Sequence, residues 1–160
     1  MWFNLEPADL PFVANSPWRF DVAEIVAAPP MRVFEAFAQP EKMAHWIIGF
    51  RRCEWKSEPG GSGAVRELEL TGIAFREHFL AWEPGRRACF AIDAMTVPLM
   101  QKMVEDVQID PIGPDRSRLV WTVHYQPTLL LHLGHPLARW ALERGYRASA
   151  ERLARFVLAN

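Results

Sequence analysis

The sequence contains little cysteine and no strong excess of charge of either sign. Its two cysteines, Cys53 and Cys89, stand apart and follow no metal-binding spacing, so we expect reduced thiols in a cytoplasmic protein. With 18 basic and 19 acidic side chains, the formal net charge is −1. This balance argues against a nucleic-acid partner and gives no indication of an anionic membrane surface as partner.

Neither a signal peptide nor a membrane span is expected from the sequence. The first residues, MWFNLEPADLPF, have neither the basic region nor the apolar centre of a signal peptide. No stretch approaches the roughly 18 apolar residues that a membrane span needs. We therefore expect no stable membrane insertion.

What the chain does have is a hydrophobic content of 50% over 160 residues, enough for one domain with a sizeable core. The first 15 residues carry Pro7 and Pro11 and are expected to form an N-terminal arm without regular structure. Residues 16–160 are expected to form a single domain. Both a monomer and a homodimer are compatible with this composition.

Periodicity and turn residues predict an α+β fold. A strand over 18–28 is followed by two short helices that begin at Pro30 and Pro40. Six more strands are expected near 51–57, 63–70, 73–82, 86–93, 101–110 and 117–126, separated by turns. A long helix then runs from Pro136 to about residue 158, and its expected buried stripe is Leu137, Ala141, Ala148, Leu153 and Phe156. The resulting seven-stranded antiparallel sheet needs a cover for its apolar face, and this helix is expected to supply it.

The turn at Thr71-Gly72 predicts which residues of the central hairpin face each other. The opposed pairs are Leu70 with Ile73, Leu68 with Phe75, and Arg66 with Glu77, and all six side chains point to the apolar side. A second hairpin at Pro84-Gly85 pairs Phe79 with Phe90, Ala81 with Ala88, and Glu77 with Ile92. A charged pair is thus expected on the face that meets the core.

Three interpretations of the Arg66–Glu77 pair are open. An isolated buried charge is very costly, so the two side chains can form a structural ion pair near the rim of the sheet. Arg66 can instead anchor a ligand carboxylate or hydroxyl in an apolar pocket, or Glu77 can be catalytic. On the wet face, a pair such as Glu67 with Arg76 would contribute little.

Glu105 is a second acidic residue in an apolar series, because it shares a face with Val107 and Ile109. We expect it near an edge, satisfied by solvent, by Arg66 or by a ligand. If it is desolvated instead, its pKa rises and it can serve as a general acid or base. Tyr125 ends the last strand, and its hydroxyl is expected to reach water.

Other polar residues form weaker patterns. His132 and His135 have a spacing that could hold a metal, but no third ligand lies nearby and Gly134-Pro136 interrupts the helix, so we expect no zinc site. Ser149 has no motif of a serine hydrolase around it. No cofactor is expected.

The chain resembles the START-like, Bet v 1-type superfamily over roughly residues 16–158. The resemblance is carried by APPMRVFEAFAQPEKMAHWI, GSGAVRELELTGIAFREHFLAWEPGRR, SRLVWTVHYQP and the final helix, and it is closest to bacterial polyketide cyclase/dehydrase and lipid-transport proteins. It implies a helix-grip fold, in which the sheet wraps around the long helix and encloses a hydrophobic cavity. The superfamily shares no common catalytic residues, so none is transferred.

This resemblance places further residues at the expected cavity. His45 and Trp46 would lie on the second short helix near its mouth. Met95, Leu99, Met100 and Met103 can form either ordinary core or a flexible cavity wall. Gly145 costs up to about 1 kcal/mol in mid-helix relative to alanine, and one explanation is that it leaves space over the cavity.

The leading hypothesis is a carrier or sensor that binds a small hydrophobic molecule, such as a lipid, fatty acid, isoprenoid or polyketide-like ring. The expected ligand-binding residues are Arg66, Leu68, Phe75, Glu77, Phe79, Phe90, Met103, Glu105, Trp121, Tyr125 and Trp46. The alternative is a polyketide aromatase/cyclase or dehydratase, for which Glu77, Glu105, His45 and Tyr125 are the weak catalytic candidates. A third hypothesis is a stress-related protein-interaction module that uses the proline-rich arm.

Overall fold

The computed structural model describes residues 1–160 and has the expected α+β architecture. In chain order its elements are β1 (Phe3–Asn4), α1 (Leu10–Asn15), β2 (Trp18–Val26), α2 (Pro30–Ala38), α3 (Pro40–Met43), β3 (Phe50–Trp55), β4 (Val65–Leu70), β5 (Ile73–Glu83), β6 (Arg87–Met95), β7 (Met100–Gly113), β8 (Arg116–Pro127), α4 (Leu129–His132) and α5 (His135–Ala159). The seven long strands and the long C-terminal helix confirm the helix-grip prediction.

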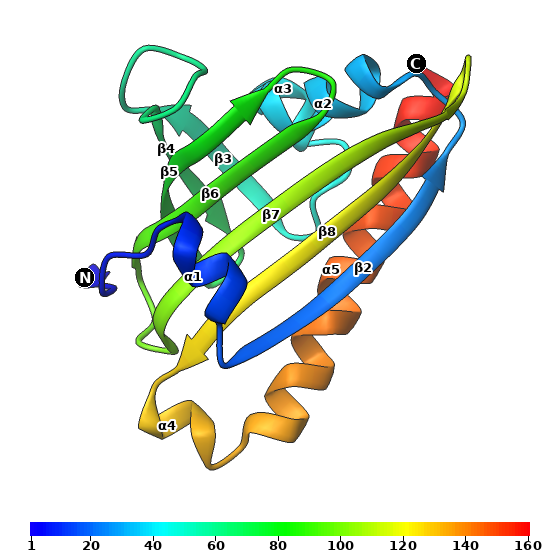
Figure 1. The fold of residues 1–160 in the computed structure, drawn as a ribbon. Helices are drawn as coiled ribbons and strands as arrows, with labels where there is room; N and C mark the ends of the chain where they lie inside the picture. The colour runs from blue at the N-terminus through cyan, green and yellow to red at the C-terminus, as the bar shows by residue number, and fades with distance from the viewer.

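The strands form one curved antiparallel sheet in the order β2-β8-β7-β6-β5-β4-β3. Two pairings are non-sequential: β2 lies at the edge beside β8, and the short β1 pairs with β6. Figure 1 shows the sheet curving around α5, which lies on one face, while α1 lies across the other face. The main core fills the space between the sheet and helices α2, α3 and α5.

The central hairpin has the predicted register. Gly72 has a positive φ of 85°, which glycine adopts without strain, and it lets β4 and β5 pair with Arg66 opposite Glu77. On the next hairpin the pairs Phe79–Phe90 and Glu77–Ile92 are confirmed. The pair Ala81–Ala88 is wrong, because a bulge between Phe79 and Ala81 shifts the register and puts Ala81 opposite Cys89.

The N-terminal segment has regular structure, contrary to expectation. Residues 3–4 form β1, which pairs with the end of β6 where β6 no longer pairs with β7. Residues 10–15 form α1, whose first turn is capped by the Asp9 carboxylate accepting from the Phe12 amide at 3.2 Å. Ala8 and Phe12 pack on the outer face of the sheet, so this segment covers part of that face. Its role as a partner-binding arm stays a prediction.

The second short helix is shorter than predicted. α3 ends at Met43, and His45 and Trp46 lie in the turns that follow it. Trp46 is nevertheless buried, because its indole nitrogen donates to the Ala36 carbonyl of α2 at 3.0 Å. His45 is exposed and stacks on Phe156.

The buried stripe of α5 differs from the predicted one. Leu137 is 72% exposed and Ala141 is exposed, Ala148 and Phe156 are half-buried, and Leu153 is buried as predicted. The helix also buries His135, Ser149, Ala150 and Val157. The reason is that the first turns of α5 extend past the end of the sheet (Figure 1), so that most of their side chains have no strand to pack against. No helix of the fold, α5 included, is long and apolar enough to cross a membrane.

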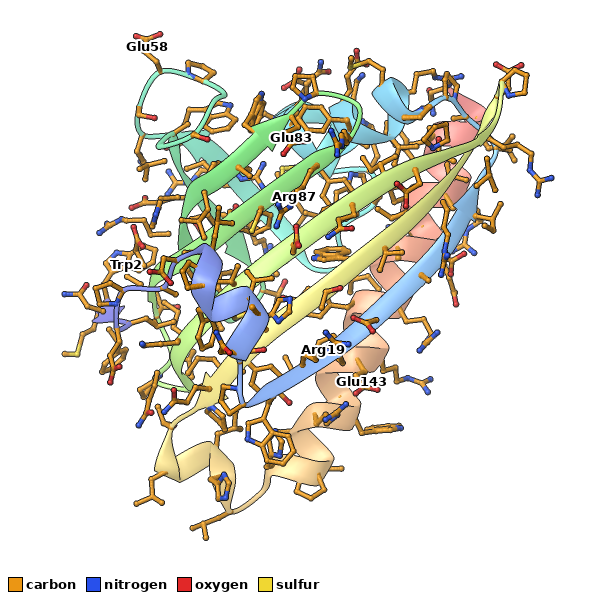
Figure 2. The ribbon with its side chains drawn as sticks, viewed as in Figure 1. Trp2, Arg19, Glu58, Glu83, Arg87 and Glu143 are labelled. Atoms are coloured by element: carbon orange, nitrogen blue, oxygen red, sulfur yellow. The ribbon has the colours of Figure 1, made fainter.

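Farther along, α5 is tied to the edge strand β2. Arg139 donates to a carboxylate oxygen of Glu143 at 2.7 Å and to the Arg19 carbonyl at 3.1 Å. Figure 2 shows Glu143 and Arg19 where α5 crosses β2. These contacts fix the helix against one side of the sheet, and the space on its other side remains for a cavity.

Candidate functional site

A cavity of about 470 Å³ lies between the sheet and α5. Twenty of its 25 lining residues are hydrophobic. The complete lining is Phe37, Met43, Trp46, Ile47, Ile48, Arg66, Leu68, Leu70, Ile73, Phe75, Glu77, Phe90, Met95, Leu99, Met100, Met103, Glu105, Trp121, Leu131, Ala138, Ala141, Leu142, Gly145, Tyr146 and Ser149. Apolar walls with a few polar groups are typical of small-molecule sites.

The cavity opens along one flank of α5. Ala141 and Gly145 line the cavity and are also exposed to solvent, as is Ile48 at 43%. A Cβ built on Gly145 would meet no atom within 4 Å, so the glycine leaves space there. This agrees with the suggested role of Gly145 over the cavity.

Arg66 and Glu77 form a buried ion pair at the cavity wall. The two residues are 1% and 2% exposed, and Arg66 Nε donates to Glu77 Oε2 at 2.5 Å. Arg66 Nη1 donates to the Phe37 carbonyl at 2.6 Å and contacts the sulfur of Met43 at 3.5 Å. The pair therefore lies under α2 and α3 rather than near a solvated rim.

Aromatic rings surround the guanidinium of Arg66. Its central carbon lies 5.0 Å from the ring centre of Phe79, 5.4 Å from Phe90 and 5.8 Å from Trp55. Such contacts stabilise a cation that is removed from water. They hold Arg66 in one position, so that the pair is a fixed feature of the cavity wall.

Glu105 is buried on the same wall, at 6% exposure. Trp121 Nε1 donates to its Oε2 at 2.8 Å, and the Tyr146 hydroxyl donates to its Oε1 at 2.6 Å. Burial, and then the nearby Glu77 charge, raise the pKa of Glu105 to about 7. The expectation of an edge position is wrong, and the desolvated alternative holds.

Some polar atoms of this group remain free. Arg66 Nη2 and Glu77 Oε1 make no hydrogen bond within the protein. Every side-chain nitrogen and oxygen that is fully buried does have a hydrogen-bond partner, so these two atoms are not among the fully buried ones. Both atoms therefore keep some accessible surface. Since both residues line the cavity, a bound molecule can reach a donor and an acceptor there. We call Arg66, Glu77, Glu105 and Tyr146 the polar cluster.

Most of the predicted binding residues come together at the cavity. Those that line it are Trp46, Arg66, Leu68, Phe75, Glu77, Phe90, Met103, Glu105 and Trp121. Phe79 lies behind Arg66 instead. Tyr125 is fully buried away from water, and its hydroxyl is hydrogen-bonded with His135 Nε2 at 2.8 Å, so the prediction that it reaches water is wrong. His45 does not line the cavity either.

Sequence reasoning missed several of the helix side chains that line the cavity. Tyr146, Leu142 and Ser149 of α5 line the cavity, and so does Phe37 of α2. The spacing of Ala138, Leu142 and Tyr146, four residues apart, could have indicated one inward face. The phase of the predicted stripe hid it, because that stripe began at Leu137.

No cluster of three or more metal-binding side chains is present. The rings of His132 and His135 stack at 6.1 Å, and burial lowers the pKa of His135. His135 is hydrogen-bonded with Tyr125, so it serves the packing of α5 against β8.

A sequence comparison decides the family. The family described as polyketide cyclase/dehydrase and lipid transport matches residues 17–157. The chain belongs to this family. Its curated relatives include the uncharacterised proteins Rv2574 of Mycobacterium tuberculosis and Mb2604 of Mycobacterium bovis, each 30% identical over 153 residues, 91% of this chain and 90% of the relative.

Solved structures from several sources share the fold of this chain. Similar folds include TTHA0849 from Thermus thermophilus, with a TM-score of 0.73 and 17% identity over 89% of this chain and 98% of that one. The protein Ara h 8.0201 has a TM-score of 0.67 and 15% identity, covering 89% of this chain and 99% of that one. BexL, a di-domain aromatase/cyclase of the BE-7585A biosynthetic pathway, has a TM-score of 0.74 and 13% identity, covering 88% and 46%. At these identities the likeness shows the fold alone.

Membership supports a function in binding hydrophobic ligands. Because the family also includes polyketide cyclases, an enzymatic role is compatible with it.

Proposed function

We propose that the protein is a carrier or sensor for a small hydrophobic molecule whose polar end is neutral, such as a hydroxyl, phenol or carbonyl group. The observation that carries this proposal is the apolar cavity of about 470 Å³ with a single polar cluster on its wall. Its volume lies within the roughly 300–1,000 Å³ of ordinary ligand sites.

The charges of the polar cluster argue for a neutral polar end. The charge of Arg66 is already balanced by Glu77 at 2.5 Å. Glu105, with a pKa of about 7, adds negative charge or none. A ligand carboxylate would therefore meet no unbalanced positive charge and would lose its hydration, which is costly. Arg66 as a carboxylate anchor is less favoured for this reason.

The same groups can bind a neutral hydroxyl or carbonyl. Arg66 Nη2 can donate and Glu77 Oε1 can accept. When Glu105 is protonated it can donate to the Tyr146 oxygen, and the Tyr146 hydroxyl hydrogen is then free for a ligand. Each polar atom of such a ligand would find a partner without adding charge to the cavity.

Matched probes test this proposal. We would measure binding of 1-dodecanol against dodecanoate and of 2-naphthol against 2-naphthoate, by calorimetry at a pH slightly above neutral. The neutral probe of each pair is expected to bind more tightly. Leu68→Glu, at the wall, should abolish binding, whereas Ile25→Glu, at a 49% exposed residue of β2, should leave it intact. Tighter binding of the acids, or equal binding by the Leu68 variant, would contradict the proposal.

Native mass spectrometry of gently purified protein complements this test. A stoichiometric hydrophobic adduct, extracted and identified, would name the chemical class of the natural ligand. Release of an adduct with a carboxylate as its only polar group would count against the neutral-end argument.

An aromatase/cyclase or dehydratase is the second candidate. The observation that favours it is Glu105, a buried acid with a pKa of about 7 that lines the cavity beside Tyr146. A general acid works best with a pKa near the working pH. Glu105→Gln should then abolish turnover of a polyketide-like substrate while its binding persists. Turnover that survives this substitution would eliminate Glu105 as the catalytic acid.

A further inference from the structure

The end of the molecule formed by α4 and the start of α5 is unusually apolar. Leu129, Leu130, Leu133 and Leu137 are 71–86% exposed, and Trp140 is 58% exposed. Figure 1 shows α4 and the first turns of α5 projecting beyond the end of the sheet. Single exposed leucines are ordinary, but five large apolar side chains exposed between residues 129 and 140 are typical of an interaction surface. We call these five residues the apolar tip.

Arg144 and Arg147, which we call the basic stripe, continue the apolar tip along α5. Leu137, Trp140, Arg144 and Arg147 are spaced by three, four and three residues and are all exposed, so they share one face of the helix. The Arg144 guanidinium carbon lies 5.6 Å from the Trp140 ring. The face therefore changes from leucine to tryptophan to arginine along the helix axis.

The local charge is positive even though the whole chain is nearly neutral. Arg144 and Arg147 take part in no ion pair, whereas Glu143, the one acidic residue between 128 and 149, is paired with Arg139 at 2.7 Å. Leucines at the apolar end, a tryptophan at the boundary and free arginines beyond it match the layers of a lipid surface: acyl chains, interface and anionic headgroups.

We propose that the apolar tip and the basic stripe dock the protein peripherally on a bilayer that contains anionic lipid. This face is adjacent to the opening of the cavity, because Ala141 and Gly145, which line that opening, lie next to the stripe on the same helix. Leu131 and Ala138, which lie between residues of the apolar tip in the chain, also line the cavity. Docking here would bring the opening to the source of a hydrophobic ligand. The docking surface itself does not depend on which ligand the cavity binds.

Vesicle sedimentation tests the proposal with the full chain. Vesicles of phosphatidylcholine with phosphatidylglycerol should bind the protein, vesicles of phosphatidylcholine alone should bind it less, and added salt should weaken binding. Leu133→Asp with Leu137→Asp should reduce partitioning about tenfold or more. Arg144→Gln with Arg147→Gln should reduce it about fivefold for each arginine.

Leu158→Asp is the matched control, since Leu158 is 65% exposed at the other end of the same helix. This variant should bind vesicles like the unsubstituted chain. All variants change exposed residues, and unchanged melting would show that they fold. Absence of vesicle binding by the unsubstituted chain would overturn the proposal, as would equal binding by the Leu133/Leu137 variant. A dimer in sedimentation velocity that this variant converts to monomer, without vesicle binding, would instead assign the tip to a second copy of the chain. Binding of 2-naphthol, measured alongside, reports on the cavity separately.

Discussion

Glu105→Gln should make the folding stability of the protein less dependent on pH. Glutamine has nearly the shape of protonated glutamate, so it can accept from Trp121 Nε1 and donate to the Tyr146 oxygen in place of the acid. It does not ionise. Comparing the variant with the unsubstituted protein therefore isolates the ionisation of one buried group.

The direction of the pH dependence of stability follows from the proton that Glu105 keeps in the folded protein. In the folded protein Glu105 keeps its proton up to a pKa of about 7, whereas the unfolded chain releases it near the ordinary value of 4.5. Between these values the folded state binds more protons, so stability falls as pH rises, and it levels off above about 7. A difference of about 2.5 pKa units corresponds to about 3 kcal/mol in the free energy of unfolding.

Urea unfolding across this pH range is the assay. The free energy of unfolding of Glu105→Gln, relative to that of the unsubstituted protein, should grow by about 3 kcal/mol between a pH below 4.5, where Glu105 is protonated in both states, and about pH 8.5. Glu151→Gln, at an exposed position of α5, is the control for general charge effects and should show no such trend. Parallel stability curves for Glu105→Gln and the unsubstituted protein, or a difference that shrinks as pH rises, would refute the reasoning.

Three further predictions concern the cavity wall. Arg66→Met should cost about 3–5 kcal/mol in the free energy of unfolding, because it leaves Glu77 buried without a partner, and adding Glu77→Leu should recover most of this loss in urea titrations. Gly145→Ala should stabilise the protein by up to about 1 kcal/mol in the same assay, since its Cβ meets no atom within 4 Å. Gly145→Leu should weaken binding of 2-naphthol in calorimetry without a loss of stability, because the new side chain takes up cavity space; unchanged affinity would mean that the ligand does not use the space beside Gly145.

The sheet could be predicted well from the sequence because its constraints are local. Turns at Thr71-Gly72 and Pro84-Gly85 fix the pairing of adjacent strands, and alternation then assigns every side chain to a face. The Arg66–Glu77 pair follows from this logic alone, and the structure has it. The one wrong pair, Ala81 with Ala88, arises from a bulge that no turn residue announces.

The environment of Glu105 could not be predicted in this way. Alternation along the strand places Glu105 on the apolar face of the sheet, but its burial depends on Tyr146, which lies on a helix 41 residues later in the chain. Helix phase is weakly determined where one side of the helix faces a cavity instead of a packed core. The small residues Ala141 and Gly145 then carry no hydrophobic signal, and the exposed Leu137 gives a misleading one.

The polar cluster is difficult to explain by folding alone. A buried glutamate whose pKa is raised to about 7 makes the folded protein less stable near neutral pH than a glutamine would. The apolar wall could accommodate a hydrophobic residue at that position, and the Arg66–Glu77 pair could likewise be replaced by apolar side chains of similar volume. Positions where a sequence departs from what its fold requires are those where a binding or catalytic role is expected. Both departures lie on one wall of one cavity, and this coincidence is the physical reason to place the function there.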